Sequence, residues 1–171
     1  MASTSRVLRP SELFKPDILS RTAMILLNGA DKTTTWWHKH WAKAGYRACT
    51  DGSANQLHAF ANQANMRPHL ISGDFDSVEP QVLRSFTDLG VDVVPTPDQD
   101  YTDFTKSLRI LLSKSDLQVT HYVAIGGLSG RFDHIMGVIE TLWWMQPTTD
   151  KPIYVVDNQS LICYIPQVDA T

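Results

Sequence analysis

The chain has few of the features that mark zinc-binding, disulfide-rich or membrane-spanning proteins. Only two of its 171 residues are cysteines, Cys49 and Cys163, and their wide separation gives neither a zinc-binding spacing nor a disulfide framework. The longest continuous apolar run, residues 23–27, is far too short to cross a membrane. Residues 1–10 contain no apolar segment of the kind found in secretory signals. These absences predict a cytoplasmic protein with no membrane partner.

An excess of positive charge is also missing. The 15 Lys and Arg residues are outnumbered by 18 Asp and Glu residues, and the resulting formal net charge of −3 argues against a nucleic-acid partner held by bulk charge. Neither the P-loop sequence nor the G-x-G-x-x-G spacing of dinucleotide-binding folds occurs. A content of 43% hydrophobic and 19% charged residues is ordinary for a globular protein, and the length suffices for one domain with a sizeable core.

Short apolar strands alternate with helical patterns along the chain. Strands are predicted at residues 23–27, 46–50, 69–72, 91–94 and 121–125. Apolar residues between and after them recur at helical spacing, as in the amphipathic helix predicted from Phe132, Ile135, Met136, Ile139, Leu142 and Trp143. The alternation predicts an α/β fold of three layers, with a mostly parallel sheet between helices. Residues 153–156 and 161–165 predict a closing β-hairpin.

Acidic residues gather in two turns that follow predicted strands. Residues 98–103 (DQDYTD) contain three carboxylates, and residues 73–77 (GDFDS) contain two more. The carboxyl ends of parallel strands meet at one edge of a sheet, where ligands bind in open α/β folds. Crowded carboxylates repel one another unless a cation lies between them, and Mg²⁺ takes carboxylates together with substrate phosphates. For residues 98–103 alone, a solvated acidic turn that caps a helix is an equal alternative, and the second acidic pair shifts the balance towards a metal site.

Two further turns offer candidate ligand contacts. Residues 126–133 (GGLSGRFD) follow a predicted strand, and backbone N–H groups of such a glycine-rich turn can face a phosphate. The guanidinium of Arg131 suits phosphate through its planar fork. Asp51, in residues 51–55 (DGSAN), falls at the same edge of the sheet. The simpler interpretations, in which the glycines only turn the chain and Asp51 is a turn residue, stay open.

Together, these four turns resemble the motifs of the thiamine pyrophosphokinase family. Each turn is a weak signal alone, but all four occur in the right order and each follows a predicted strand. The resemblance covers nearly everything between residues 23 and 165. Ser53 and Ser129 depart from it, because the family usually has glycine at both positions, and either hydroxyl could crowd a phosphate or replace a water contact.

The resemblance implies a homodimeric enzyme that transfers pyrophosphate from ATP to the hydroxyl of thiamine, giving thiamine diphosphate and AMP. Mg²⁺ is the implied cofactor, and ATP and thiamine are the implied partners. The metal is assigned to Asp74, Asp76 and Asp103, with Asp100 as a further catalytic candidate. Nucleotide and phosphate contacts are assigned to Asp51, Asn55, Gln99, Thr102, Gly127, Arg131 and Asp133.

The family's enzymes continue into a β-sandwich domain that helps to bind thiamine. The resemblance therefore divides the chain into a loose lead-in (residues 1–21), an ATP-binding catalytic domain (22–157) and the start of a β domain (158–171). We expect this chain to bind Mg-ATP but to make thiamine diphosphate poorly or not at all alone, because much of the acceptor site would be missing. Two alternatives are a non-catalytic or regulatory form that still binds Mg-nucleotide, and an unrelated Mg²⁺-dependent phosphohydrolase.

Overall fold

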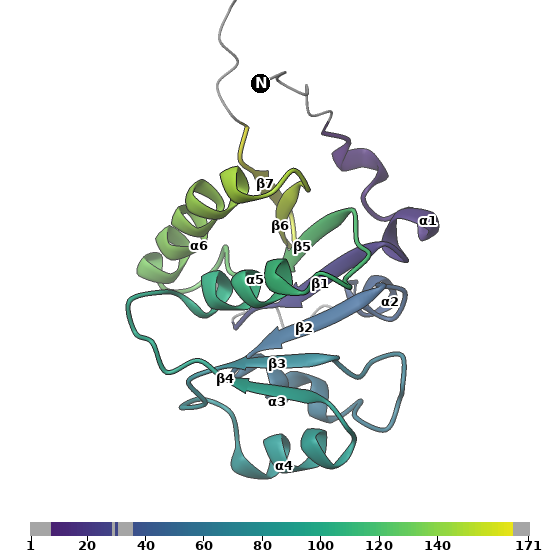
Figure 1. Cartoon of the computed structure of the whole chain (residues 1–171), viewed down its shortest axis with the longest axis vertical. Helices are drawn as coiled ribbons and strands as arrows, with labels where there is room; N and C mark the ends of the chain where they lie inside the picture. Colours follow the sequence, from purple (N-terminus) through teal and green to yellow (C-terminus); the bar gives the residue numbers. More distant parts are fainter. Residues whose placement is uncertain (1–7, 29, 31–35, 166–171) are drawn as a thin grey trace, which may run out of the picture.

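The computed structural model describes residues 8–28, 30 and 36–165. Within them, a seven-stranded sheet has the order β4-β3-β2-β1-β5-β6-β7 (Figure 1). All neighbouring strands are parallel except β6 and β7, which are antiparallel. The predicted α/β fold class, with a mostly parallel sheet and a closing hairpin, is confirmed.

The strands lie within two residues of their predicted ends. They are β1 (Thr22–Leu26), β2 (Tyr46–Thr50), β3 (Leu70–Gly73), β4 (Asp92–Pro95), β5 (His121–Ile125), β6 (Ile153–Asp157) and β7 (Ser160–Cys163). Every residue of β1 and β6 is buried, as expected for central strands covered on both faces.

Helices cover both faces of the sheet (Figure 1). One core contains residues of α1 (Pro16–Leu19), α2 (His38–Trp41), α3 (Ser53–His58) and α4 (Pro80–Asp88), and the other contains residues of α5 (Asp103–Ser113) and α6 (Phe132–Met145). Short 3-10 helices precede α1 (η1, Pro10–Glu12) and follow α6 (η2, Gln146–Thr148). The two separate cores establish the predicted three layers.

The described start of the chain is packed against this domain. Leu13 and Leu19 are each 1% exposed, and the carbonyl of Leu19 accepts a hydrogen bond from the N–H of Gly45 at 3.0 Å. The expectation of a loose lead-in is therefore wrong for residues 8–21, because a few buried leucines anchor a segment whose average composition is polar. Residues 1–7 lie outside the described part, and the proposed domain boundaries at 21 and 157 stay predictions.

The order of the strands reverses beside β1. From β1 the chain proceeds to β2, β3 and β4 on one side, and then crosses back to place β5 on the other side. In open α/β sheets such a reversal leaves a crevice outside the carboxyl ends of the two central strands. A ligand site is therefore expected at the turns after β1 and β5.

Candidate active site

A cavity of about 370 Å³ lies at this reversal point. Its lining comes from the turns after β1, β3, β4 and β5 and from the first turns of α5 and α6. The predicted site residues in the lining are Asp74, Gln99, Thr102, Asp103, Gly127 and Asp133. The cavity thus combines residues from three of the four predicted motifs, those at residues 73–77, 98–103 and 126–133.

Three carboxylates converge beside this cavity. Asp51, Asp74 and Asp76 each offer an oxygen, and these oxygens all lie within 4.8 Å of one another. The parallel pairing of β2 with β3, which sets Thr50 beside Ser72, brings the turn after β2 against the turn after β3. Three oxygen donors at this spacing suit a hard cation such as Mg²⁺. The acids that the structure brings together are thus Asp51, Asp74 and Asp76, and the assignment of Asp103 to the metal stays a prediction.

Asp51 is held in place by the turn that contains the other two acids. Its side chain is buried, and its two oxygens accept hydrogen bonds from the N–H groups of Ser77 (3.1 Å) and Val78 (3.2 Å). Gly73 makes this approach possible, because a Cβ at residue 73 would lie 2.7 Å from the Cβ of Asp51. Burial raises the pKa of the Asp51 carboxyl, and the neighbouring Asp76 raises that pKa further. The charged form of Asp51 is therefore disfavoured by burial and by the neighbouring carboxyl group of Asp76.

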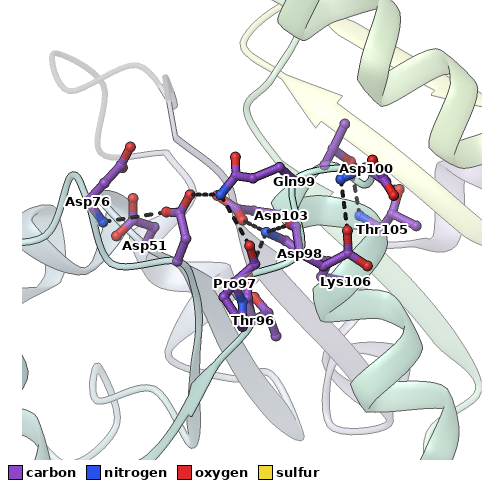
Figure 2. Close-up of polar contacts among 12 residues, drawn as sticks. Asp51, Asp76, Thr96, Pro97, Asp98, Gln99, Asp100, Asp103, Thr105 and Lys106 are labelled. Atoms are coloured by element: carbon purple, nitrogen blue, oxygen red, sulfur yellow. Dashed lines mark hydrogen bonds and ion pairs between the residues drawn. The ribbon is translucent and has the colours of Figure 1, made fainter.

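Gln99 links the acid trio to the turn before α5. Its Nε2 donates to Oδ2 of Asp74 at 2.9 Å and to the carbonyl of Pro97 at 3.3 Å. The donated hydrogen bond is the main cause of the lowered pKa of Asp74. Figure 2 shows Gln99 between Asp51 and Asp76 on one side and Asp103 on the other. Gln99 therefore orients Asp74 and keeps its carboxyl group charged.

Lys106 neutralises Asp103 and was not assigned a role from the sequence. Its side chain is 7% exposed, and its Nζ lies 2.8 Å from Oδ1 of Asp103, 2.9 Å from the carbonyl of Thr96 and 3.0 Å from that of Asp98 (Figure 2). These three oxygens use all three N–H donors of an ammonium group. Lys106 thus fixes the turn between β4 and α5. The three-residue spacing from Asp103 to Lys106 on a predicted helix was the available signal.

Thr102 and Asp100 have different surroundings. The hydroxyl of Thr102 caps α5 by accepting from the N–H of Thr105 at 3.1 Å, and it lies 3.1 Å from the hydroxyl of Thr141 on α6. Asp100 lines a separate small hollow together with Glu140 and Trp144. The structure therefore places Thr102 at the cavity as a helix cap, and it does not bring Asp100 to the acid trio.

The remaining predicted residues lie around the rim. Asn55 ties α3 to the turn after β3, because its amide donates to the carbonyl of Ser77 at 3.0 Å and accepts from the N–H of Glu79 at 3.0 Å. Arg131 and Asp133 form an exposed ion pair at the start of α6, with Nε and Oδ1 3.1 Å apart. This pairing lowers the pKa of Asp133 and raises that of Arg131.

A buried carboxylate also supports the glycine-rich turn. Oδ2 of Asp157, at the end of β6, accepts a hydrogen bond from the N–H of Leu128 at 3.0 Å. Gly126 and Gly127 before it adopt φ values of +88° and +89°, and a Cβ at residue 126 would meet Ala30 at 2.7 Å. Both observations show that the turn has a fixed path past the cavity, which only glycine allows at residue 126.

Fold and geometry together define an α/β domain with a cavity and a group of acids at the strand-order reversal. A family model described as "Thiamin pyrophosphokinase, catalytic domain" matches residues 37–155. The chain belongs to the thiamine pyrophosphokinase family. Thiamin pyrophosphokinase 1 of Caenorhabditis elegans is 34% identical over 170 residues, a match that covers 97% of this chain and 67% of the relative. Thiamine pyrophosphokinase 3 of Oryza sativa is 34% identical over 142 residues, covering 74% and 52%.

Solved structures agree with the fold. Thiamin pyrophosphokinase from Candida albicans superposes with a TM-score of 0.67 at 23% identity, covering 84% of this chain and 60% of that one. The yeast thiamin pyrophosphokinase gives a TM-score of 0.65 at 22% identity, covering 91% and 66%. This chain spans about half to two thirds of the length of these relatives. No helix in the described residues is long and apolar enough to cross a membrane.

Proposed function

We propose that this chain binds Mg-ATP at the carboxyl edge of its sheet and transfers pyrophosphate from ATP to the hydroxyl of thiamine. The observation that supports this most directly is the convergence of Asp51, Asp74 and Asp76 within 4.8 Å beside a cavity, in a chain of this family. The proposal moves Asp51 into the metal-binding group and leaves Asp103 as the partner of Lys106.

The trio fits a magnesium ion by the chemistry of its donors. All three groups are carboxylates, and burial, followed by the neighbouring Asp76, raises the pKa of Asp51, so a nearby cation would stabilise its charged form. Bound Mg²⁺ would neutralise charge on the phosphates of ATP. The protein orients two of the donors beforehand, Asp51 through the N–H groups of Ser77 and Val78 and Asp74 through the amide of Gln99.

The start of α6 is the better candidate for the phosphates. The first turn of α5 is capped internally by Thr102, whereas no side chain caps α6. The N–H groups at the start of α6 therefore remain suited to an anion. Gly127 lines the cavity just before this helix, and Arg131 is exposed with Asp133 as an ion-pair partner that it can exchange for phosphate.

The proposed reaction is a displacement at phosphorus. The hydroxyl oxygen of thiamine forms a bond to the β-phosphorus of ATP, the bond from that phosphorus to the oxygen retained by AMP breaks, and the hydroxyl proton leaves. Catalysis of such a transfer depends mainly on alignment and on charge neutralisation. The residues around the cavity would hold ATP in the position that transfer requires. Lys106 keeps the turn that contains Gln99 in one conformation.

One assay tests the proposal. The purified chain is incubated with Mg-ATP, with and without thiamine, and the products are separated by chromatography, with an EDTA sample as the control. Thiamine diphosphate and AMP, formed only with both substrates, would support transfer. Nucleotide cleavage without thiamine would indicate a hydrolase instead. ATP bound in calorimetry without any product would leave a nucleotide-binding module, and the transfer proposal would then be wrong for this chain.

A further inference from the structure

A second hollow lies at the carboxyl edge of the sheet, beside the candidate active site. Its volume is about 440 Å³, and it is lined by Leu128 and Ser129 of the glycine-rich turn and by residues 157–160 of the β6–β7 hairpin. The same turn borders the active-site cavity through Gly127. One short stretch of chain therefore borders both spaces, so a ligand in the hollow would lie close to a ligand in the cavity.

Asp157 gives this hollow a buried negative charge. The residue is only 7% exposed, yet it forms part of the lining. Its Oδ2 accepts a hydrogen bond from the N–H of Leu128 at 3.0 Å. Within the part of the chain that the structure describes, no Lys, Arg or His forms an ion pair with Asp157. A buried carboxylate that has a neutral donor but no positive partner can still accept a cation.

The position of this carboxylate is fixed before any ligand binds. The N–H of Gly126 donates to the carbonyl of Val156 at 2.9 Å, and the N–H of Leu128 donates to Asp157. Both hydrogen bonds join the glycine-rich turn to β6, on which Asp157 is the last residue. A charge that is already oriented adds affinity for a ligand because little ordering is needed on binding.

The other lining residues are neutral and polar. Asn158, Gln159 and Ser160 offer groups that donate and accept hydrogen bonds. Ser129, where the family usually has glycine, lines this hollow and is not in the lining of the active-site cavity. One carboxylate among neutral polar groups repels a phosphate and suits a small organic cation.

We propose that this hollow binds the cationic ring of the acceptor and that Asp157 is the counter-charge of that ring. The inference rests on the proposed function, in which the acceptor is thiamine. Thiamine carries a permanent positive charge on its thiazolium ring, and its hydroxyl group ends a short arm attached to the same ring. With the ring in the hollow, the arm can extend along the glycine-rich turn towards phosphates at the start of α6. Asp157 is thus a specificity-determining residue that favours a positively charged acceptor.

Titration calorimetry of the whole chain tests the recognition of charge. The two titrants are thiamine and an uncharged isostere in which a thiophene ring replaces the thiazolium ring. Mg²⁺ is present with an ATP analogue that has a methylene group between its α- and β-phosphorus atoms, so that no transfer can occur. The wild-type chain should bind thiamine about tenfold more tightly than the isostere, the size expected for a contact between charged groups.

Asp157→Asn removes the charge and keeps an oxygen that can accept the hydrogen bond from Leu128. Its affinity for thiamine should fall about tenfold, and its affinity for the isostere should stay the same. Asp150→Asn is the matched control, because it makes the same change in net charge at an exposed acid in the loop before β6, at the other end of that strand. This control should bind both compounds as the wild-type chain does.

Amide NMR spectra of the ¹⁵N-labelled chain test the location. Thiamine should shift the signals of Leu128, Ser129 and Gln159, which line the hollow. The same concentration of thiamine should shift them much less in Asp157→Asn. The signal of Gly90, in the hollow at the amino end of the sheet, should not move in either chain. Shifts that are confined to other parts of the chain would contradict the proposed site.

Three calorimetric results would overturn the inference. The wild-type chain could fail to bind thiamine up to its solubility limit, or Asp157→Asn could bind thiamine as tightly as the wild-type chain. Asp157→Asn could also lose affinity equally for thiamine and for the isostere, which would show that Asp157 only shapes the turn.

Failure of this inference can be distinguished from failure of the proposed function. If the chain forms thiamine diphosphate and Asp157→Asn leaves the KM for thiamine unchanged, the function stands and this inference is wrong. If thiamine binds as expected but the chain does not bind Mg-ATP, the cation site stands and the proposed function is wrong.

Discussion

The two ends of the sheet hold charged residues in very different states. At the amino end, a hollow of about 620 Å³ is lined by Arg47, Arg67, His69, Asp92 and Lys114 among others. The guanidinium of Arg47 donates to the carbonyls of Arg67 (2.8 Å) and Ala44 (3.0 Å), and that of Arg67 donates to the carbonyl of Leu89 (3.2 Å). At the carboxyl end, the smaller cavity borders carboxylates that crowd one another.

The difference shows that the size of a hollow does not identify a site. The arginines at the amino end already have partners in the backbone, so they hold loops together and have little left to offer a ligand. In the acid trio, N–H groups orient Asp51 and Asp74, and burial raises the pKa of Asp51, so the charged form of that carboxyl group would gain from a cation. A binding site is thus better recognised by charges that need a partner than by volume.

Replacing one acidic residue at each end of the sheet should give the largest difference in affinity for Mg-ATP. Asp76→Asn removes an exposed carboxylate from the trio, and we expect Mg-ATP affinity to fall about 100-fold, as when a metal site loses a ligand or its support. Asp92→Asn, at the amino end, removes an acid that pairs only loosely with Lys114 at 3.5 Å and should leave that affinity unchanged. Titration calorimetry measures both. An equal loss in the two variants would contradict the assignment.

Two lysines allow the same comparison for stability. Lys106→Met leaves Asp103 without its ammonium partner and two carbonyls without their donor, so the free energy of unfolding should fall by about 3 kcal/mol. Lys114→Met breaks an exposed pair with Asp92 and should cost less than about 1 kcal/mol. Urea unfolding distinguishes them. If the two losses were similar, Lys106 would not be the fixed centre of its turn.

Replacement of Arg47 should lower the stability of the fold without changing the affinity for Mg-ATP. In Arg47→Met the carbonyls of Arg67 and Ala44 lose their donor, which should lower the free energy of unfolding by about 2 kcal/mol. Affinity for Mg-ATP should not change in the folded protein. Arg84→Met, which removes an exposed arginine of α4, serves as the control for both measurements. A loss of affinity in Arg47→Met alone would show that the amino end takes part in binding.

The pH dependence of the acid trio should give the smallest effect. The folded pKa of Asp51 is raised, so stability should fall as pH rises from the ordinary value of 3.8 through that raised pKa, because the charged form is disfavoured in the fold. Mg²⁺ should reverse this loss. At ten times its dissociation constant it would add about 1.4 kcal/mol, a rise of a few degrees in Tm.

Comparison at two pH values completes this test. The rise in Tm with Mg²⁺ should be larger at pH 7 than at pH 5, since protons compete for the carboxylates at the lower pH. Asp51→Asn should reduce the rise at pH 7, and Asp116→Asn, at the amino end, should not. A rise that is independent of both pH and Asp51 would place the metal elsewhere.

The site was only partly predictable from the sequence. Strand and helix alternation placed Asp51, Asp74, Asp76 and Asp103 at one edge of a sheet, and the structure confirms that placement. Which of the acids meet depends on strand order, because β2 lies beside β3 and their turns touch. The partner of Asp103 depends on the path of Lys106 across the turn into α5. The local sequence pattern does not specify which strands lie side by side or where a side chain extends.

The sequence by itself determined the elements, the fold class and the family, because local periodicity and turn residues specify short strands and helices and the motifs occur in order. Tertiary structure decided which face of each helix is buried and which face is exposed. The apolar residues of α6 form one broad pattern in sequence, but packing against the sheet buries Leu142 and leaves Phe132 and Trp143 exposed. Lys106 and Asp51 are buried at other contacts, Lys106 against the turn before α5 and Asp51 against the turn after β3. Burial depends on which surfaces meet, and that is fixed only when distant segments pack together.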